Sequence, residues 1–187
     1  DNPVKAIELC RKPVIGAING VAITGGFEVA LACDVLVAST NARFADTHAR
    51  VGIVPGWGLS QKLSRMIGIS RAKELAFTGN FLDAATAHAW GLVNHVTAPD
   101  ELLPLARKLA ADMAGIDPAF LANYKRLIDD GYAASFGEGL ALEAARSSAA
   151  PSPVAAAWTP RAASTASAAR PVSAARSRSA ACASATR

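Results

Sequence analysis

The sequence predicts an α/β fold that contains a pair of parallel strands. Residues 13–18 and 34–39 are short apolar runs of the kind that forms buried strands. Between them, residues 27–33 have the pattern of a helix that begins after Gly25 and Gly26. A strand, a helix and a second strand in this order are typical of a βαβ unit, whose strands pair in parallel.

The segments after this unit are mainly helical. Asp83 is an expected N-cap, Gly91 an expected helix end, and Asp117 followed by Pro118 marks another helix start. Glycines and a proline predict an irregular stretch over residues 45–58. We expect helices over residues 59–67, 71–77, 84–90, 102–113, 118–128 and 140–148, and a short strand over residues 93–96.

The composition changes at Pro151, after which Ala, Ser, Arg, Pro and Thr predominate. The 187-residue chain has a net charge of +4, but all of its acidic residues precede residue 144. The basic balance therefore belongs to residues 151–187, whose arginines are scattered and whose only aromatic residue is Trp158. This pattern does not indicate a nucleic-acid-binding arm. We expect the segment to be a disordered tail, because it has too few large apolar residues to form a core.

The cysteines and the apolar segments exclude several classes of protein. Cys10, Cys33 and Cys182 form no close pair and have no metal-ligand spacing, which favours a reduced, cytoplasmic protein without a metal site. The most apolar stretch, residues 14–38, is interrupted by polar residues and glycines, so no membrane span is expected. The first residues do not have the pattern of a signal peptide.

The segment with the clearest chemical content is residues 19–28, which includes Gly25, Gly26 and Glu28. Two glycines before a helix allow backbone torsions and close approach that other residues resist. The N–H groups of the first helical turn can stabilise an anion or a developing oxyanion, and Glu28 follows within one turn. Taken alone, the same pattern is also typical of a tight turn in which the glutamate merely favours the helix start.

Eight short blocks follow one another in a fixed order between residues 5 and 148. They are residues 12–20 (KPVIGAING), 25–28 (GGFE), 32–34 (ACD), 42–44 (ARF), 52–56 (GIVPG), 63–65 (LSR), 78–79 (TG) and 87–93 (AHAWGLV). In this order they closely resemble the crotonase superfamily, the enoyl-CoA hydratase/isomerase family. The resemblance implies a spiral core of ββα turns followed by C-terminal helices that mediate trimer contacts. We therefore expect part of the spiral core over residues 1–97, a helical trimerisation region over residues 98–150, and the tail over residues 151–187.

The resemblance also implies an acyl-CoA substrate whose thioester oxygen is bound by two N–H donors. Gly25 matches the position of one donor. In the family the other donor comes from a segment upstream of the strand that begins at Pro13, and the chain that starts at Asp1 does not contain it. We expect an N-terminally truncated member of the family.

Hydratases of this family use two glutamates to hold water and move protons, and Glu28 matches the first of them. The second position is occupied by His48. Histidine can act as acid or base near neutral pH, but His48 can equally well line the pocket without exchanging protons. Asp46 is the other candidate for the missing carboxylate, but it is expected to point away from the side that His48 faces. Gly26, Thr47 and Gly56 are the candidate substrate-binding residues.

These residues predict an enzyme that adds water to the double bond of a 2-enoyl-CoA thioester, with Glu28 and His48 as catalytic residues and Gly25 in the oxyanion hole. No cofactor is expected beyond the coenzyme A of the substrate. The expected assembly is a homotrimer or a dimer of trimers, without nucleic-acid or membrane partners. The alternatives are another crotonase-type reaction, such as isomerisation, decarboxylation or C–C cleavage, and an inactive fragment or binding partner.

Overall fold

The computed structural model describes residues 2–148. The chain separates into two units, Asp1–Ser147 and Ser148–Arg187, and the described helices and strands lie in the first unit, apart from Ser148 at the end of the last helix. The predicted tail of residues 151–187 lies outside the described residues. The division of the body at residues 97 and 98 stays a prediction.

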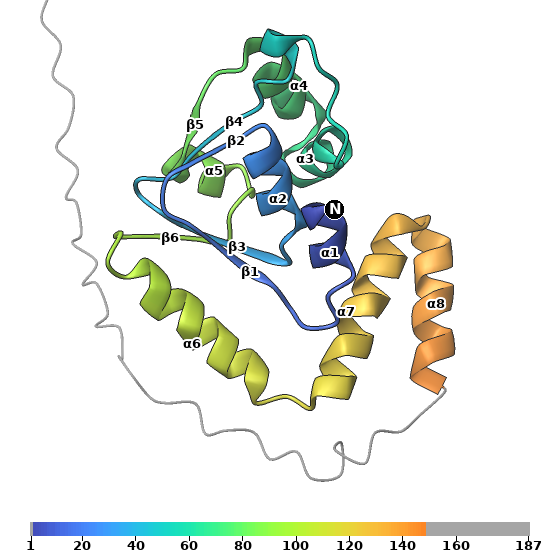
Figure 1. The fold of residues 1–187 in the computed structure, drawn as a ribbon. Helices are drawn as coiled ribbons and strands as arrows, with labels where there is room; N and C mark the ends of the chain where they lie inside the picture. Colours follow the sequence, from blue (N-terminus) through green and yellow to red (C-terminus); the bar gives the residue numbers. More distant parts are fainter. Residues whose placement is uncertain (1, 149–187) are drawn as a thin grey trace, which may run out of the picture. The chain divides into compact units, whose positions relative to one another are not determined.

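Two three-stranded sheets form the centre of the described unit (Figure 1). The first sheet has the order β1-β3-β6 and is parallel throughout; the second has the order β2-β4-β5, with β2 and β4 parallel and β4 and β5 antiparallel. Their bounds are β1 Ile15–Ile18, β2 Val21–Ile23, β3 Val35–Ser39, β4 Arg43–Ala45, β5 Leu82–Asp83 and β6 His95–Thr97.

The chain alternates between the two sheets as it advances. Strand β1 lies in the first sheet and β2 in the second, helix α2 (Gly25–Ala32) follows, and β3 and β4 then repeat the step. Ile15 lies opposite Val35 in one sheet, and Ala22 lies opposite Phe44 in the other. This alternation is the ββα spiral that the family resemblance implies, and it confirms the predicted α/β class and the parallel βαβ pairing.

The core lies where α2, the second sheet and helix α3 (Leu59–Ile67) meet. Phe27 of α2 and Phe44 of β4 are fully buried, with ring centroids 5.4 Å apart. Leu59, Leu63 and Ile67 are also buried, and their spacing of four residues places them on one face of α3. This packing fixes α2 against the start of α3, which is where the candidate catalytic residues meet.

The remaining helices are α1 Pro3–Glu8, α4 Ile69–Thr78, α5 Ala84–Ala89, α6 Leu102–Ala114, α7 Pro118–Ala133 and α8 Phe136–Ser148. Helices α4, α5 and α6 agree with the predicted ones to within two residues, whereas α7 ends five residues later and α8 begins four residues earlier than predicted. Asp83 and Asp117 are N-caps as predicted, their side chains accepting from the N–H groups of Thr86 and Phe120. The sequence-based assignment missed α1, β2, β4 and β5 and placed β6 two residues too early, because segments of two to six residues carry too little periodicity to be recognised.

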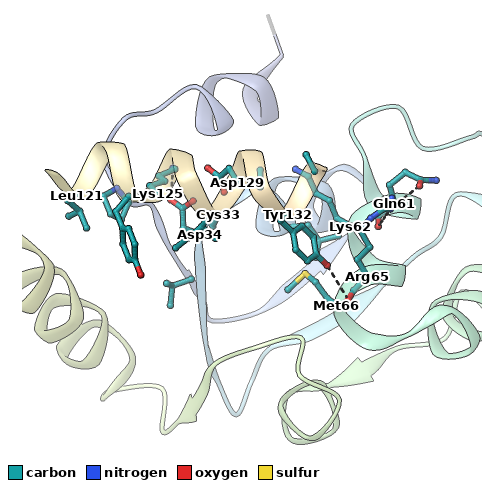
Figure 2. A pocket seen from close by; sticks show the side chains of 17 residues that line it. Cys33, Asp34, Gln61, Lys62, Arg65, Met66, Leu121, Lys125, Asp129 and Tyr132 are labelled. Carbon is teal, nitrogen blue, oxygen red and sulfur yellow. Dashed lines mark hydrogen bonds and ion pairs between the residues drawn. The ribbon is translucent and has the colours of Figure 1, made fainter. Parts of the chain in front are cut away.

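Helix α7 is joined to the residue before β3 by a partly buried ion pair. The Lys125 Nζ atom lies 2.7 Å from Asp34 Oδ2, which also accepts from the N–H of Val14 at 2.7 Å. Figure 2 shows this pair at one side of a pocket of about 750 Å³ between α7 and the core. At its other side the Tyr132 hydroxyl donates to the Arg65 carbonyl oxygen at 3.5 Å. Among the helices of residues 2–148, none has the length and apolar character needed to cross a membrane.

Candidate active site

Helix α2 carries Glu28 into the interior. The helix begins at Gly25, directly after the N-cap residue Thr24, whose side chain makes no capping hydrogen bond. Glu28 therefore lies in the first turn, on the same buried part of the helix as Phe27 and Leu31. A carboxylate in such a place needs polar partners, because burial without them is costly.

Backbone amides at the start of α3 provide those partners. Oε1 of Glu28 accepts from the N–H of Trp57 at 2.7 Å and from the N–H of Leu59 at 3.4 Å. The two donors hold the carboxylate in one orientation and leave Oε2 facing the opposite way. Oε2 lies 3.7 Å from Nε2 of His48.

His48 is held in turn by Asp46. Its ring Nδ1 lies 2.7 Å from Asp46 Oδ1, and its backbone N–H donates to the same oxygen at 3.1 Å. Glu28, His48 and Asp46 are 4%, 5% and 3% exposed, so the three side chains form a buried row of carboxylate, imidazole and carboxylate.

The expectation that Asp46 points away from His48 is wrong. Side chains two residues apart in an extended segment lie on the same side, so alternation does not separate Asp46 from His48. The structure shows an extended strand only as far as Ala45, and His48 has helical torsions (φ −55°, ψ −47°) that lead into a short 3-10 helix, Ala49–Val51. The carboxylate of Asp46 bonds to the backbone N–H and the ring of the residue two positions later. Short polar side chains commonly bond to the backbone two residues on in such turns.

Thr24 and Thr47 join the segments that carry Glu28 and His48. Their hydroxyl groups are hydrogen-bonded to each other, and the N–H of Thr24 donates to the carbonyl oxygen of Ala45 at 3.2 Å. Thr24 has a φ of +50°, the only positive φ among the non-glycine residues that the structure describes. The expected unusual torsions therefore fall on the threonine before the two glycines, whereas Gly25 and Gly26 are helical.

The three glycines of the predicted site lie in different surroundings. Gly25 is partly buried, and a Cβ atom there would lie 3.5 Å from the Trp57 ring. Gly26 and Gly56 are exposed, with open space where a Cβ atom would be. The amide that bonds to Glu28 belongs to Trp57, one residue after Gly56. The roles of these residues toward a substrate stay predictions.

Two hollows of different character lie near these elements. One, of about 590 Å³, is lined by His48 and Asp46 together with apolar side chains that include Ile53, Val54 and Phe77. The pocket of Figure 2 contains none of the candidate site residues. In that pocket, burial and the neighbouring Asp34 carboxylate raise the pKa of the Cys33 thiol. Within residues 2–148, no three His, Cys, Asp or Glu side chains are grouped so that they could hold a metal ion.

The chain matches a known protein family over most of its length. The family described as enoyl-CoA hydratase/isomerase matches residues 1–153. The chain belongs to this family. It is 50% identical over 148 residues to a protein of Arabidopsis thaliana named probable enoyl-CoA hydratase 1, peroxisomal, and the match covers 79% of this chain and 56% of that protein.

Solved structures of the enoyl-CoA hydratase/isomerase family give the same result. An enoyl-CoA hydratase from Bacillus anthracis is 37% identical with a TM-score of 0.72, over 75% of this chain and 54% of that one. A monofunctional enoyl-CoA isomerase from M. smegmatis is 39% identical with a TM-score of 0.68, over 73% and 64% of the two chains. The chain spans about half the length of the curated relatives it matches.

Four contributors to the site were missed by the sequence-based reasoning. Asp46 was discounted, and Thr24 and the amides of Trp57 and Leu59 were not considered. The only available signal for Asp46 was its place two residues before His48, which is typical of side-chain-to-backbone turns. Nothing in the sequence marks a backbone amide as a partner of a distant carboxylate.

Proposed function

We propose that the whole protein adds water to the double bond of a 2-enoyl-CoA thioester. The observation that carries this proposal is the opposition of Glu28 Oε2 and His48 Nε2 at 3.7 Å, both on buried side chains. Atoms at this separation can each lie about 2.8 Å from one water molecule, which is hydrogen-bonding distance. One water can therefore contact both groups at once.

The reaction uses this pair as base and acid. Glu28 removes a proton from the water, whose oxygen bonds to the β-carbon, and the π electrons move to the thioester oxygen. The N–H of Gly25, at the positive end of α2, stabilises the charge on that oxygen. Protonated His48 then gives its Nε2 proton to the α-carbon. The proton that Glu28 took from the water passes to His48 Nε2, so both side chains return to their starting states.

Two further observations support an acyl thioester as the substrate. The hollow beside His48 is lined mainly by apolar side chains, which suits the hydrocarbon part of such a compound. The relative from Arabidopsis thaliana and the solved structure from Bacillus anthracis both have names that identify them as enoyl-CoA hydratases.

Hydration of crotonyl-CoA by the purified whole protein tests the proposal, followed by the loss of absorbance of the conjugated thioester. Glu28→Gln is expected to lower kcat about 100-fold or more, the usual contribution of a general base. Glu74→Gln, on the exposed side of α4, is the matched control and should leave kcat unchanged. Unchanged turnover in Glu28→Gln would overturn the proposal.

The second candidate is a double-bond isomerisation, which the similarity to the enoyl-CoA isomerase from M. smegmatis favours. A base and an acid side by side can move a proton between two carbons of an enolate as well as add water. Product analysis by mass separates the two reactions, because only hydration adds the mass of water. Absence of both products with the whole protein would favour an inactive binding partner.

We further propose a cytoplasmic enzyme of fatty acid metabolism that assembles as a homotrimer or a dimer of trimers. We propose no cofactor apart from the coenzyme A of the substrate. Cys10 and Cys33 are free thiols, which is usual for a reducing compartment. Light scattering on the purified whole protein measures the assembly, and a monomeric mass would contradict the proposed trimer.

A further inference from the structure

A single oxygen of Asp46 holds both the backbone and the ring of His48. Oδ1 accepts from the backbone N–H at 3.1 Å and lies 2.7 Å from ring Nδ1. Both residues are almost fully buried, so water does not readily replace either bond. The two bonds fix the position of the imidazole at its Nδ1 edge.

This arrangement determines which ring nitrogen carries hydrogen. An ionised carboxylate can only accept hydrogen bonds, so Nδ1 must be the protonated nitrogen in the neutral ring. The other nitrogen, Nε2, then faces Oε2 of Glu28 at 3.7 Å. In the imidazolium form Nδ1 keeps its hydrogen and the additional proton is on Nε2.

We propose that Asp46 is a positioning residue that confines the proton exchange of His48 to Nε2, the nitrogen that faces Glu28. The proposal rests on the proposed function, because it gives His48 its place in the proton transfer. Within residues 2–148, the hydrogen bonds of the Asp46 carboxylate go to the backbone N–H and the ring Nδ1 of His48, whereas Glu28 is held independently by the amides of Trp57 and Leu59.

The position of the proton can be measured without any activity. In the 187-residue chain, which contains three histidines, nitrogen-15 NMR of the imidazoles distinguishes a protonated Nδ1 from a protonated Nε2. His48→Gln assigns the His48 signals, and the exposed rings of His88 and His95 are internal references. At a pH high enough for the ring to be neutral, we expect His48 to be a single Nδ1–H tautomer in the unsubstituted chain and a mixture in Asp46→Ala.

Kinetics of the whole protein test whether this position matters. Asp46→Ala is expected to lower kcat about 10- to 100-fold, as the loss of an orienting partner usually does, with little change in KM. In the His48→Gln background the same substitution should cause no further loss, because its route of action is already removed.

Asp46→Asn is the conservative variant and guards against poor folding of Asp46→Ala. The backbone N–H of His48 requires an acceptor, so the amide oxygen of the asparagine takes the place of Oδ1 and also accepts from Nδ1–H. We therefore expect Asp46→Asn to keep the single tautomer and at least tenfold more kcat than Asp46→Ala.

Three results would overturn the inference: an unchanged tautomer in Asp46→Ala, equal losses in the Ala and Asn variants, or the same loss from Asp46→Ala with and without His48. If the unsubstituted whole protein hydrates no enoyl-CoA, the proposed function fails. The NMR measurement then decides the place of the proton by itself.

Discussion

The carboxylate of Glu28 and the imidazole of His48 face each other across 3.7 Å, although α2 carries one and the turn after β4 carries the other. Each has a separate anchor on its far side: the amides of Trp57 and Leu59 for Glu28, and Asp46 for His48. Because each group has its own anchor, the loss of one anchor is not expected to move the other group.

Replacement of His48 by glutamate is expected to destabilise the protein, even though it restores the residue type usual in the family. The new carboxylate would be buried between those of Asp46 and Glu28, with no cation among them. Loss of the partner in a buried charged pair typically costs about 3 kcal/mol. Urea unfolding measures the change.

His95→Glu is the control for this substitution, because His95 is exposed in β6. A surface substitution there should change the free energy of unfolding by no more than about 0.5 kcal/mol. Equal stability of His48→Glu and the unsubstituted chain would contradict the row of contacts described for the site.

Gly79→Ala is expected to destabilise the chain more than Gly52→Ala. Both glycines are left-handed, with φ +60° and ψ 23° at Gly79 and φ +69° and ψ 26° at Gly52, so the backbone strain is similar, about 1 kcal/mol. At Gly79 the added Cβ would also overlap with Arg50 Nε, whereas Gly52 has open space. The displaced Arg50 would lose its bonds to the Thr78 carbonyl oxygen, at 2.9 and 2.7 Å.

Thermal unfolding of both variants, with and without Arg50→Ala, measures this difference. The excess cost of Gly79→Ala should be about 1 kcal/mol, the usual value of such hydrogen bonds. It should disappear in the Arg50→Ala background. An excess that persists there would show that Arg50 is not its cause.

Asp83→Ala is expected to lower the free energy of unfolding by about 1 kcal/mol at neutral pH, the usual value of an N-cap. Hydrogen bonds from the backbone N–H and side chain of Thr86 lower the pKa of Asp83 below its ordinary value of 3.8. A lowered pKa in the folded state stabilises the protein above about pH 4. This contribution is lost as the pH falls through the lowered pKa.

The difference between Asp83→Ala and the unsubstituted chain should therefore shrink in acid. Urea unfolding at neutral pH and at successively lower pH values below 3.8 measures the trend. A difference that grows in acid would contradict the assigned hydrogen bonds.

Lys125→Met is expected to loosen helix α7. The ion pair of Lys125 with Asp34 is partly buried, and it joins α7 to the residue before β3. Its loss should speed amide hydrogen exchange throughout Pro118–Ala133, because local opening becomes easier. Lys108→Met is the control: Lys108 pairs with Asp112 in α6 at a largely exposed position, and such pairs contribute little.

Helices and caps that depend only on residues within their own segment were predicted well. The bounds of α3 agree with the prediction because Leu59, Leu63 and Ile67 repeat along one face. The caps at Asp83 and Asp117 need only local hydrogen bonds and were also predicted. Strands β2 and β4 consist of three residues each and depend on their pairing with one another, which the sequence does not display.

The candidate site was predictable in its residues and not in its contacts. The glycine pair and Glu28 lie within four consecutive residues, so the motif alone places them at the start of one helix. The contact of Asp46 with His48 depends on the local backbone, which turns at His48, and the Thr24–Thr47 hydrogen bond joins two segments that are separate in the sequence. Periodicity within a segment contains no information of this kind.

Asp46 Oδ1 binds both the backbone N–H and the ring Nδ1 of His48, and this limits how the site can evolve. A lineage that changed His48 to glutamate in one step would place three carboxylates in a row, and one that lost Asp46 first would release the imidazole while it is still needed. The two positions must therefore change together or through a neutral intermediate, such as asparagine at position 46. Among related sequences, histidine at position 48 should be inherited jointly with an acceptor two residues before it.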